Sequence, residues 1–169
     1  MLIKPKARFK SIIKITPAFL ENRGIKGIIL DLDNTLTLHD DAVPQDGVMD
    51  WLNKMRENNI KMIIVSNNTY ERVLPTANKL GLSFVAKGKK PLTSGFTKAK
   101  KIMELNKKQI AVIGDQIFTD MICGNMSGMY TILVEPFEDE RYGFLHFKRV
   151  IQKRLFPARS INEQNIWIS

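Results

Sequence analysis

The 169-residue chain contains one cysteine, Cys123. A single cysteine excludes an internal disulfide and any zinc site built from several cysteines. No apolar run approaches the roughly 18 residues that a membrane-spanning helix needs, and the basic N-terminus lacks the continuous apolar stretch of a secretory signal. Neither glycine-rich phosphate-binding pattern, G-x-G-x-x-G or G-x-x-x-x-G-K-[ST], is present. We therefore expect a cytoplasmic protein that is not integral to a membrane.

The charge of the chain is concentrated at its two ends. The net charge is +9, of which residues 1–14 and residues 141–169 each carry +5, while residues 15–140 carry −1. Basic segments attract polyanions, either nucleic acid or anionic lipid, although such runs also occur as plain solvated surface. The length fits one domain over residues 1–169, with a core at about 25–135 between basic N- and C-terminal extensions.

Short apolar runs alternate with helical patterns through the middle of the chain. Helices are predicted around Val48–Met55 and over residues 70–80, 94–105 and 119–126; in the third, Phe96, Ala99, Ile102 and Met103 should face the core. Strands are predicted over residues 27–32, 60–65, 83–86, 109–114 and 130–134. The alternation predicts an α/β fold with βαβ units and a mainly parallel five-stranded sheet.

Polar residues stand directly after the predicted strands. Because functional sites of open parallel sheets lie outside the carboxyl ends of the strands, these residues should meet at one edge. The candidates are Asp31 and Asp33 after the first strand, Ser66 and Asn67 after the second, Lys90 after the third, and Asp115 with Asp120 after the fourth.

These residue types suit phosphoryl chemistry. Side chains two apart on a strand point the same way, so Asp31 and Asp33 can face one reactant. With Asp115 they form a hard, all-oxygen site suited to Mg²⁺. An ionised Asp31 can attack phosphorus, and Asp33 can protonate the leaving oxygen and later deprotonate water. Ser66 can donate to a phosphoryl oxygen, and Lys90 supplies positive charge.

The motifs resemble a known superfamily. The run Asp31-Leu32-Asp33-Asn34-Thr35-Leu36 is similar to the first motif of the haloacid dehalogenase (HAD) superfamily, and Ser66, Lys90 and Asp115 with Asp120 match the second, third and fourth motifs in order and spacing. The Lys90-Pro91 pair and the run from Gly114 to Asp120 resemble subfamily IIIA, specifically the bacterial YqeG-type phosphatases, which are related to the mitochondrial phosphatidylglycerophosphate phosphatase. The resemblance covers about residues 25–135.

The resemblance implies a Rossmann-like core with helices on both faces of the sheet, Mg²⁺ as cofactor, and phosphomonoester hydrolysis through an aspartyl-phosphate. It implies Asp31 as nucleophile, Asp33 as acid and base, and Ser66 and Lys90 as phosphoryl ligands, with Asn67 beside them at the substrate. The implied metal ligands are Asp31, Asp33 through its backbone carbonyl, Asp115 and, in support, Asp120. Two alternatives stay open from the residues alone: a neighbouring lysine, Lys87 or Lys89, in place of Lys90, and a helix-capping role for Asp120.

The spacing of the motifs bears on the substrate. Only 34 residues separate Asp31 from Ser66 and 23 separate Ser66 from Lys90, which leaves no room for a cap domain. An uncapped site suits a phosphate on something large. Together with the basic ends, the resemblance to YqeG-type phosphatases implies a phosphorylated substrate with a phospholipid head group, phosphatidylglycerophosphate. The alternatives are a soluble phosphatase for a sugar phosphate, nucleotide or nucleic-acid end, and a non-catalytic binding module. The oligomeric state stays open.

Both basic ends carry apolar stripes at helical spacing. Residues 5–16 are predicted as a helix with Phe9, Ile12 and Ile13 on one face and Lys6, Lys10 and Lys14 repeating every four residues. A second stripe comprises Phe144, Phe147, Ile151 and Leu155. An apolar stripe beside a basic face is typical of interfacial helices, which would give peripheral contact with an anionic membrane at its inner face. Packing of each stripe against the sheet is the alternative, and nucleic acid is the less favoured polyanion.

Overall fold

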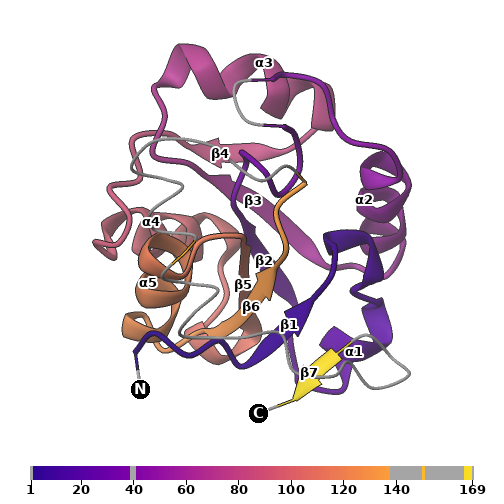
Figure 1. The fold of residues 1–169 in the computed structure, drawn as a ribbon, viewed down its shortest axis with the longest axis vertical. Coiled ribbons are helices and arrows are strands. Elements are labelled where there is room, and N and C mark those ends of the chain that lie inside the picture. The colour runs from indigo at the N-terminus through magenta and orange to yellow at the C-terminus, as the bar shows by residue number, and fades with distance from the viewer. Residues whose placement is uncertain (1, 39–40, 138–149, 151–165, 169) are drawn as a thin grey trace.

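A computed structural model describes residues 2–38, 41–137, 150 and 166–168 (Figure 1). The α-helices are α1 (Pro17–Glu21), α2 (Val48–Glu57), α3 (Tyr70–Leu80), α4 (Ser94–Met103) and α5 (Ile122–Met126). Short helical turns are η1 (Ile12–Lys14), η2 (Lys107–Gln109) and the π-helical turn η3 (Ile117–Met121). The strands are β1 (Ala7–Phe9), β2 (Gly27–Leu30), β3 (Lys61–Val65), β4 (Ser83–Val85), β5 (Ile110–Gly114), β6 (Tyr130–Val134) and β7 (Ile166–Ile168).

One sheet organises the described residues, with strand order β4-β3-β2-β5-β6-β1-β7. All neighbouring strands are parallel except β7, which pairs antiparallel with β1. The five predicted strands are β2 to β6 and lie side by side, which confirms the α/β class and the mainly parallel sheet. Two strands that the sequence did not predict, β1 and β7, extend the sheet on the β6 side.

Helices cover both faces of the sheet, as expected for a Rossmann-like core (Figure 1). One face buries Ile28, Leu30 and Ile64 against apolar side chains of α1, α2 and α3. The other face buries Ile29 and Ile63 against α4 and α5. Because alternate residues of a strand point to opposite faces, the central strands are apolar throughout.

Most predicted helices form as their patterns indicate. In α2 the spaced residues Val48, Trp51, Leu52 and Met55 are buried. Helix α3 runs through Pro75 and ends at Gly81, whose φ of 63° is a left-handed conformation that glycine adopts readily. Two details differ. Ile102, expected in the core, is 49% exposed on α4, and β2 ends at Leu30 rather than at Leu32.

The predicted helix over residues 5–16 is wrong. The segment forms β1, which pairs with β6, followed by the short turn η1. Phe9 and Ile12 are buried in the core, whereas Ile13 is 42% exposed. The apolar stripe therefore packs against the sheet, because strand pairing with β6 overrides the local helical periodicity. The second stripe, Phe144 to Leu155, lies outside the described residues.

The connections that could hold a cap are short in the described chain. Between β2 and β3 the described residues form one helix, α2, and between β3 and β4 they form only α3. This arrangement agrees with the predicted absence of a cap domain. None of the helices in the described residues is long and apolar enough to cross a membrane.

Candidate active site

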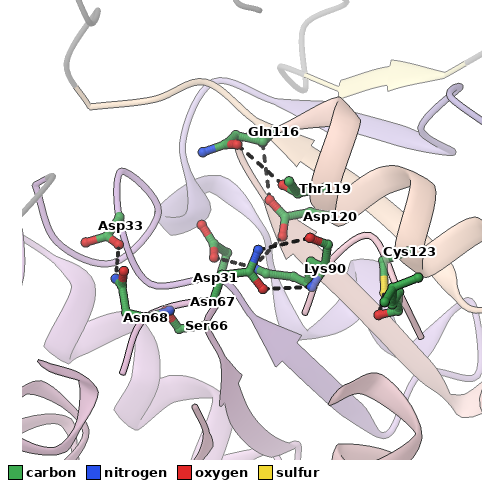
Figure 2. Close-up of polar contacts among 11 residues, drawn as sticks. Asp31, Asp33, Ser66, Asn67, Asn68, Lys90, Gln116, Thr119, Asp120 and Cys123 are labelled. Carbon is green, nitrogen blue, oxygen red and sulfur yellow. Dashed lines mark hydrogen bonds and ion pairs between the residues drawn. The ribbon is translucent and has the colours of Figure 1, made fainter. Parts of the chain in front are cut away.

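The sequence-predicted polar residues gather at the carboxyl edge of the sheet. Asp31 follows β2, Lys90 follows β4, and Asp115 follows β5. Asp120 lies in η3, whose backbone bulges next to the end of β5. In Figure 2 the side chains of Asp31, Lys90 and Asp120 point toward one another. Three strands and one helical turn, far apart in sequence, thus build one polar cluster.

Lys90 joins two of the carboxylates. Its Nζ lies 2.5 Å from Asp31 Oδ1 and 2.7 Å from Asp120 Oδ1, and its side chain is 3% exposed. Burial by itself lowers the pKa of the Lys90 ammonium, but Asp120 and Asp31 outweigh burial and raise that pKa above its usual value. Lys90 is therefore charged at neutral pH. The flanking Lys87 and Lys89 are exposed, so the buried lysine of the cluster is Lys90.

Asp120 is buried at 1% exposure among groups of both signs. Burial and, next, the nearby Asp31 carboxylate raise the pKa of Asp120, and Lys90 lowers it, with a net rise to about 6. The backbone N–H of Gln116 also donates to Asp120 Oδ2 at 3.3 Å. Asp120 therefore makes a capping contact at the start of η3 and also pairs with Lys90 in the cluster. Its supporting role at a metal stays a prediction.

The donor set fits a divalent cation. Carboxylate oxygens of Asp31, Asp115 and Asp120 all lie within 4.8 Å of one another. The three carboxylates outnumber the single ammonium of Lys90 among these groups, so the set carries excess negative charge. Hard oxygen ligands of this kind suit Mg²⁺. The Asp33 side chain is not part of the set. Its contribution through the backbone carbonyl stays a prediction.

Asn67 positions Lys90 in the described structure. Its Oδ1 accepts a hydrogen bond from the Lys90 backbone N–H at 2.7 Å, and its Nδ2 donates to the Lys90 carbonyl at 3.0 Å. Both ends of the amide therefore hold the lysine backbone. The predicted contact between Asn67 and substrate stays a prediction, beside this positioning role.

Two glycines let the lysine loop pack closely. A Cβ at Gly95 would lie 2.7 Å from the carbonyl oxygen of Gly88. A Cβ at Gly88 would lie 2.7 Å from Val65 Cγ1. Larger residues at either position would push the loop that carries Lys90 away from the end of β3.

Ser66 lies at the end of β3 and is 2% exposed. Its Oγ accepts a hydrogen bond from the Asn68 backbone N–H at 3.1 Å, which leaves the hydroxyl proton for donation. This geometry is compatible with the predicted contact to a phosphoryl oxygen.

Asp33 points away from the Lys90 cluster (Figure 2). Asn68 Nδ2 donates to Asp33 Oδ2 at 2.6 Å, and the Arg72 guanidinium lies 3.3 Å from Asp33 Oδ1. The sequence argument placed Asp33 on a strand with Asp31, but β2 ends before both residues. The strand rule therefore does not set the direction of Asp33; its partners after β3 do.

Sequence reasoning missed Arg72 and the role of the Asn68 side chain. Both residues follow β3, the strand next to β2, so a search of the first helical turn after each strand would have found them. It also missed Gly114, which borders Asp120 at the end of β5.

Comparison with known proteins agrees with this site. A family model described as mitochondrial PGP phosphatase matches residues 1–137. The chain belongs to this phosphatase family. A relative from Bacillus subtilis, named probable phosphatase YqeG, is 40% identical over 154 residues, which cover 91% of this chain and 90% of the relative. The predicted YqeG-type resemblance is thereby confirmed, and the chain is a HAD-type phosphatase rather than a non-catalytic module.

Two further proteins, one yeast relative and one solved structure, are similar to this chain. The phosphatidylglycerophosphatase GEP4 of Saccharomyces cerevisiae mitochondria is 29% identical over 149 residues, covering 73% of this chain and 80% of the yeast protein. The cobalt-bound deoxy-D-mannose-octulosonate 8-phosphate phosphatase YrbI of Haemophilus influenzae superposes with a TM-score of 0.51 at 20% identity, covering 66% of this chain and 69% of that one. This solved structure therefore shares the fold of the present chain.

Proposed function

We propose that the protein hydrolyses phosphomonoesters with Mg²⁺ through an aspartyl-phosphate on Asp31, and that its substrate is phosphatidylglycerophosphate. The observation that carries the chemistry is the buried contact of Lys90 with Asp31 and Asp120 beside Asp115. Lys90 binds Asp31 through Oδ1, which orients the carboxylate and keeps positive charge where phosphoryl oxygens would gather.

The proposed reaction has two steps. In the first, an Asp31 oxygen forms a bond to phosphorus, the bond from phosphorus to the leaving oxygen breaks, and Asp33 gives that oxygen a proton. In the second, Asp33 takes a proton from water, the water oxygen bonds to phosphorus, and the bond between Asp31 and phosphorus breaks to release phosphate. The net change is hydrolysis of one phosphomonoester bond.

The metal belongs to the proposal as well. Asp31, Asp115 and Asp120 would hold Mg²⁺, with the Asp33 carbonyl as a further ligand. When bound, Mg²⁺ supplies positive charge that offsets the negative charge on the phosphoryl oxygens. The H. influenzae phosphatase, which shares the fold, is described as cobalt-bound, and a divalent cation is in keeping with that description.

Two findings support the lipid substrate. The matching family is described by its PGP phosphatase activity, and the yeast relative is named a phosphatidylglycerophosphatase. The short connections after β2 and β3 also leave the site without an inserted cap in the described residues, which suits a phosphate at a lipid surface. A soluble sugar phosphate or nucleotide remains the second candidate, because the H. influenzae phosphatase, which shares the fold, is named for a sugar phosphate.

The test compares phosphate release from phosphatidylglycerophosphate in mixed micelles with release from a panel of soluble phosphomonoesters, all in Mg²⁺. We expect a kcat/KM at least about tenfold higher for the lipid. The Asp31→Asn variant serves as the matched negative control. A higher kcat/KM for a sugar phosphate or nucleotide would replace the lipid with that substrate, and no release from any ester would contradict the reaction itself.

A further inference from the structure

Both carboxylate oxygens of Asp33 are held by side chains that follow β3. Asn68 Nδ2 donates to Oδ2 at 2.6 Å, and the Arg72 guanidinium donates to Oδ1 at 3.3 Å. Because the donors act on different oxygens, they fix the direction of the carboxylate as well as its position. Hydrogen bonds to a charged acceptor are also roughly twice as strong as neutral ones.

The donors themselves are held in place. The Asn68 backbone N–H donates to Ser66 Oγ at 3.1 Å, and its carbonyl accepts from the Lys87 N–H at 2.8 Å. Arg72 lies in the first turn of α3, and its side chain is 29% exposed. Asn68 in the loop after β3 and Arg72 in α3 therefore both bind Asp33 from the connection that follows the neighbouring strand.

The contacts that hold Asp33 are separate from those of Asp31, the proposed nucleophile. Asp31 is bound by Lys90, whereas the side-chain partners described for Asp33 are Asn68 and Arg72. Figure 2 shows Asp33 turned to Asn68 and away from Asp120. The two aspartates of the first motif are thus oriented by two independent sets of residues.

We infer that Asn68 and Arg72 are positioning residues that hold the Asp33 carboxylate for proton transfer to the leaving oxygen of the substrate, an inference that rests on the proposed function. Proton donation matters most when the leaving group is a poor one. An alkyl alcohol must take a proton as it departs, whereas p-nitrophenolate is stable without one. Loss of these two contacts should therefore slow the first step, departure of the leaving group, much more for alkyl phosphates than for p-nitrophenyl phosphate.

The experiment measures kcat and KM of the full chain with Mg²⁺ on two alkyl esters, glycerol 3-phosphate and phosphatidylglycerophosphate, and on p-nitrophenyl phosphate. For Arg72→Ala and Asn68→Ala we expect kcat/KM on the alkyl esters to fall about tenfold, part of the 10²–10⁴-fold typical of acid catalysis. The kcat/KM on p-nitrophenyl phosphate should change by less than about twofold. This ratio reports the steps up to departure of the leaving group and excludes hydrolysis of the aspartyl-phosphate, in which Asp33 acts as base for every ester. Arg72→Lys should recover part of the loss, since it retains a cationic donor.

Lys79→Ala is the matched control, because it removes an exposed cation from the same helix. It should leave all rates unchanged. Combining Arg72→Ala with Asp33→Asn gives a second test. If Arg72 acts through Asp33, the double variant should be no slower than Asp33→Asn alone.

Three outcomes would overturn the inference. An equal loss of kcat/KM on alkyl and aryl esters, in a variant with an unchanged melting temperature, would show a role unrelated to protonation of the leaving group. A rise in KM at constant kcat would make Arg72 a substrate ligand instead. Additive losses in the double variant would separate Arg72 from Asp33. A wild-type chain that hydrolyses none of the three esters would defeat the proposed function too, whereas these three outcomes leave it standing.

Discussion

Gly114 and Asp120 occupy adjoining space at the end of β5. A Cβ built on Gly114 would overlap the Asp120 carboxylate and lie 2.7 Å from Asp120 Cβ. Asp120 is buried and rigid, since it belongs to η3 and is bound by Lys90. The absence of a side chain at position 114 is therefore what lets Asp120 reach the cluster.

Replacing Gly114 tests this relationship. Gly114→Ala should displace Asp120 and lower kcat by about 10²-fold, the effect typical of a misplacement of about 1 Å. Gly24→Ala is the control: a Cβ there meets nothing within 4 Å, and its φ of 69° should cost only stability, about 1 kcal/mol. Steady-state kinetics and thermal unfolding measure both. Full activity of Gly114→Ala would contradict the steric argument.

Asp31→Asn should abolish turnover while the protein stays folded. The change is nearly isosteric, but it removes the nucleophile and one anionic partner of Lys90. Phosphate release and circular dichroism give the two readouts. Substantial hydrolysis by the folded variant would rule out the aspartyl-phosphate.

Metal dependence follows from the three carboxylates. Turnover should require Mg²⁺ and stop in excess EDTA, and Ca²⁺ should substitute poorly because it takes more ligands at longer distances. Mg²⁺ should also raise the melting temperature by mass action, and Asp115→Asn should remove most of that rise. Full activity in EDTA, or an unchanged rise in melting temperature with Mg²⁺ in the Asp115→Asn variant, would contradict the proposed magnesium site.

Cys123 should be chemically inert in the folded protein. It is fully buried, and burial raises the pKa of its thiol to about 12, so the thiolate is scarce at pH 8. Iodoacetamide at pH 8 should label it slowly in native protein and rapidly in denaturant, where its pKa returns to roughly 8.5. Labelling at equal rates in both conditions would refute this environment.

The basic N-terminal segment offers a test of membrane contact. Lys4, Lys10 and Lys14 are exposed. Lys6 is exposed as well, but its Nζ donates to the Met129 carbonyl at 2.8 Å, so it is best left unchanged. Each lysine near an anionic surface contributes about 1 kcal/mol, so changing the three to Glu should abolish sedimentation with anionic liposomes. Turnover of p-nitrophenyl phosphate should be unaffected, because these lysines lie outside the cluster.

The same charge change elsewhere is the control for that test. Lys98, Lys101 and Lys108 are exposed and changing them to Glu should leave liposome binding largely intact. Equal loss in both triple variants would indicate a response to net charge, and undiminished binding of the N-terminal variant would exclude that segment as the anchor.

The sequence by itself determined which strands and helices of the core follow one another along the chain, and which residues stand at the strand ends. Buried parallel strands are apolar throughout, and the chain must change to polar residues where each strand leaves the sheet, so Asp31, Ser66, Lys90 and Asp115 stand out by position. Helix α2 was equally visible, because its buried residues repeat at helical spacing.

Tertiary structure alone decided the contacts that depend on neighbours far along the chain. Residues 7–9 carry a helical pattern, yet pairing with β6 makes them a strand. Asp33 lies two residues from Asp31, but Asn68 and Arg72 turn it to a different side. Local periodicity records which side chains are buried; it does not record which distant backbone pairs with a segment or which distant donor orients a carboxylate, because those depend on how the strands are ordered in the sheet.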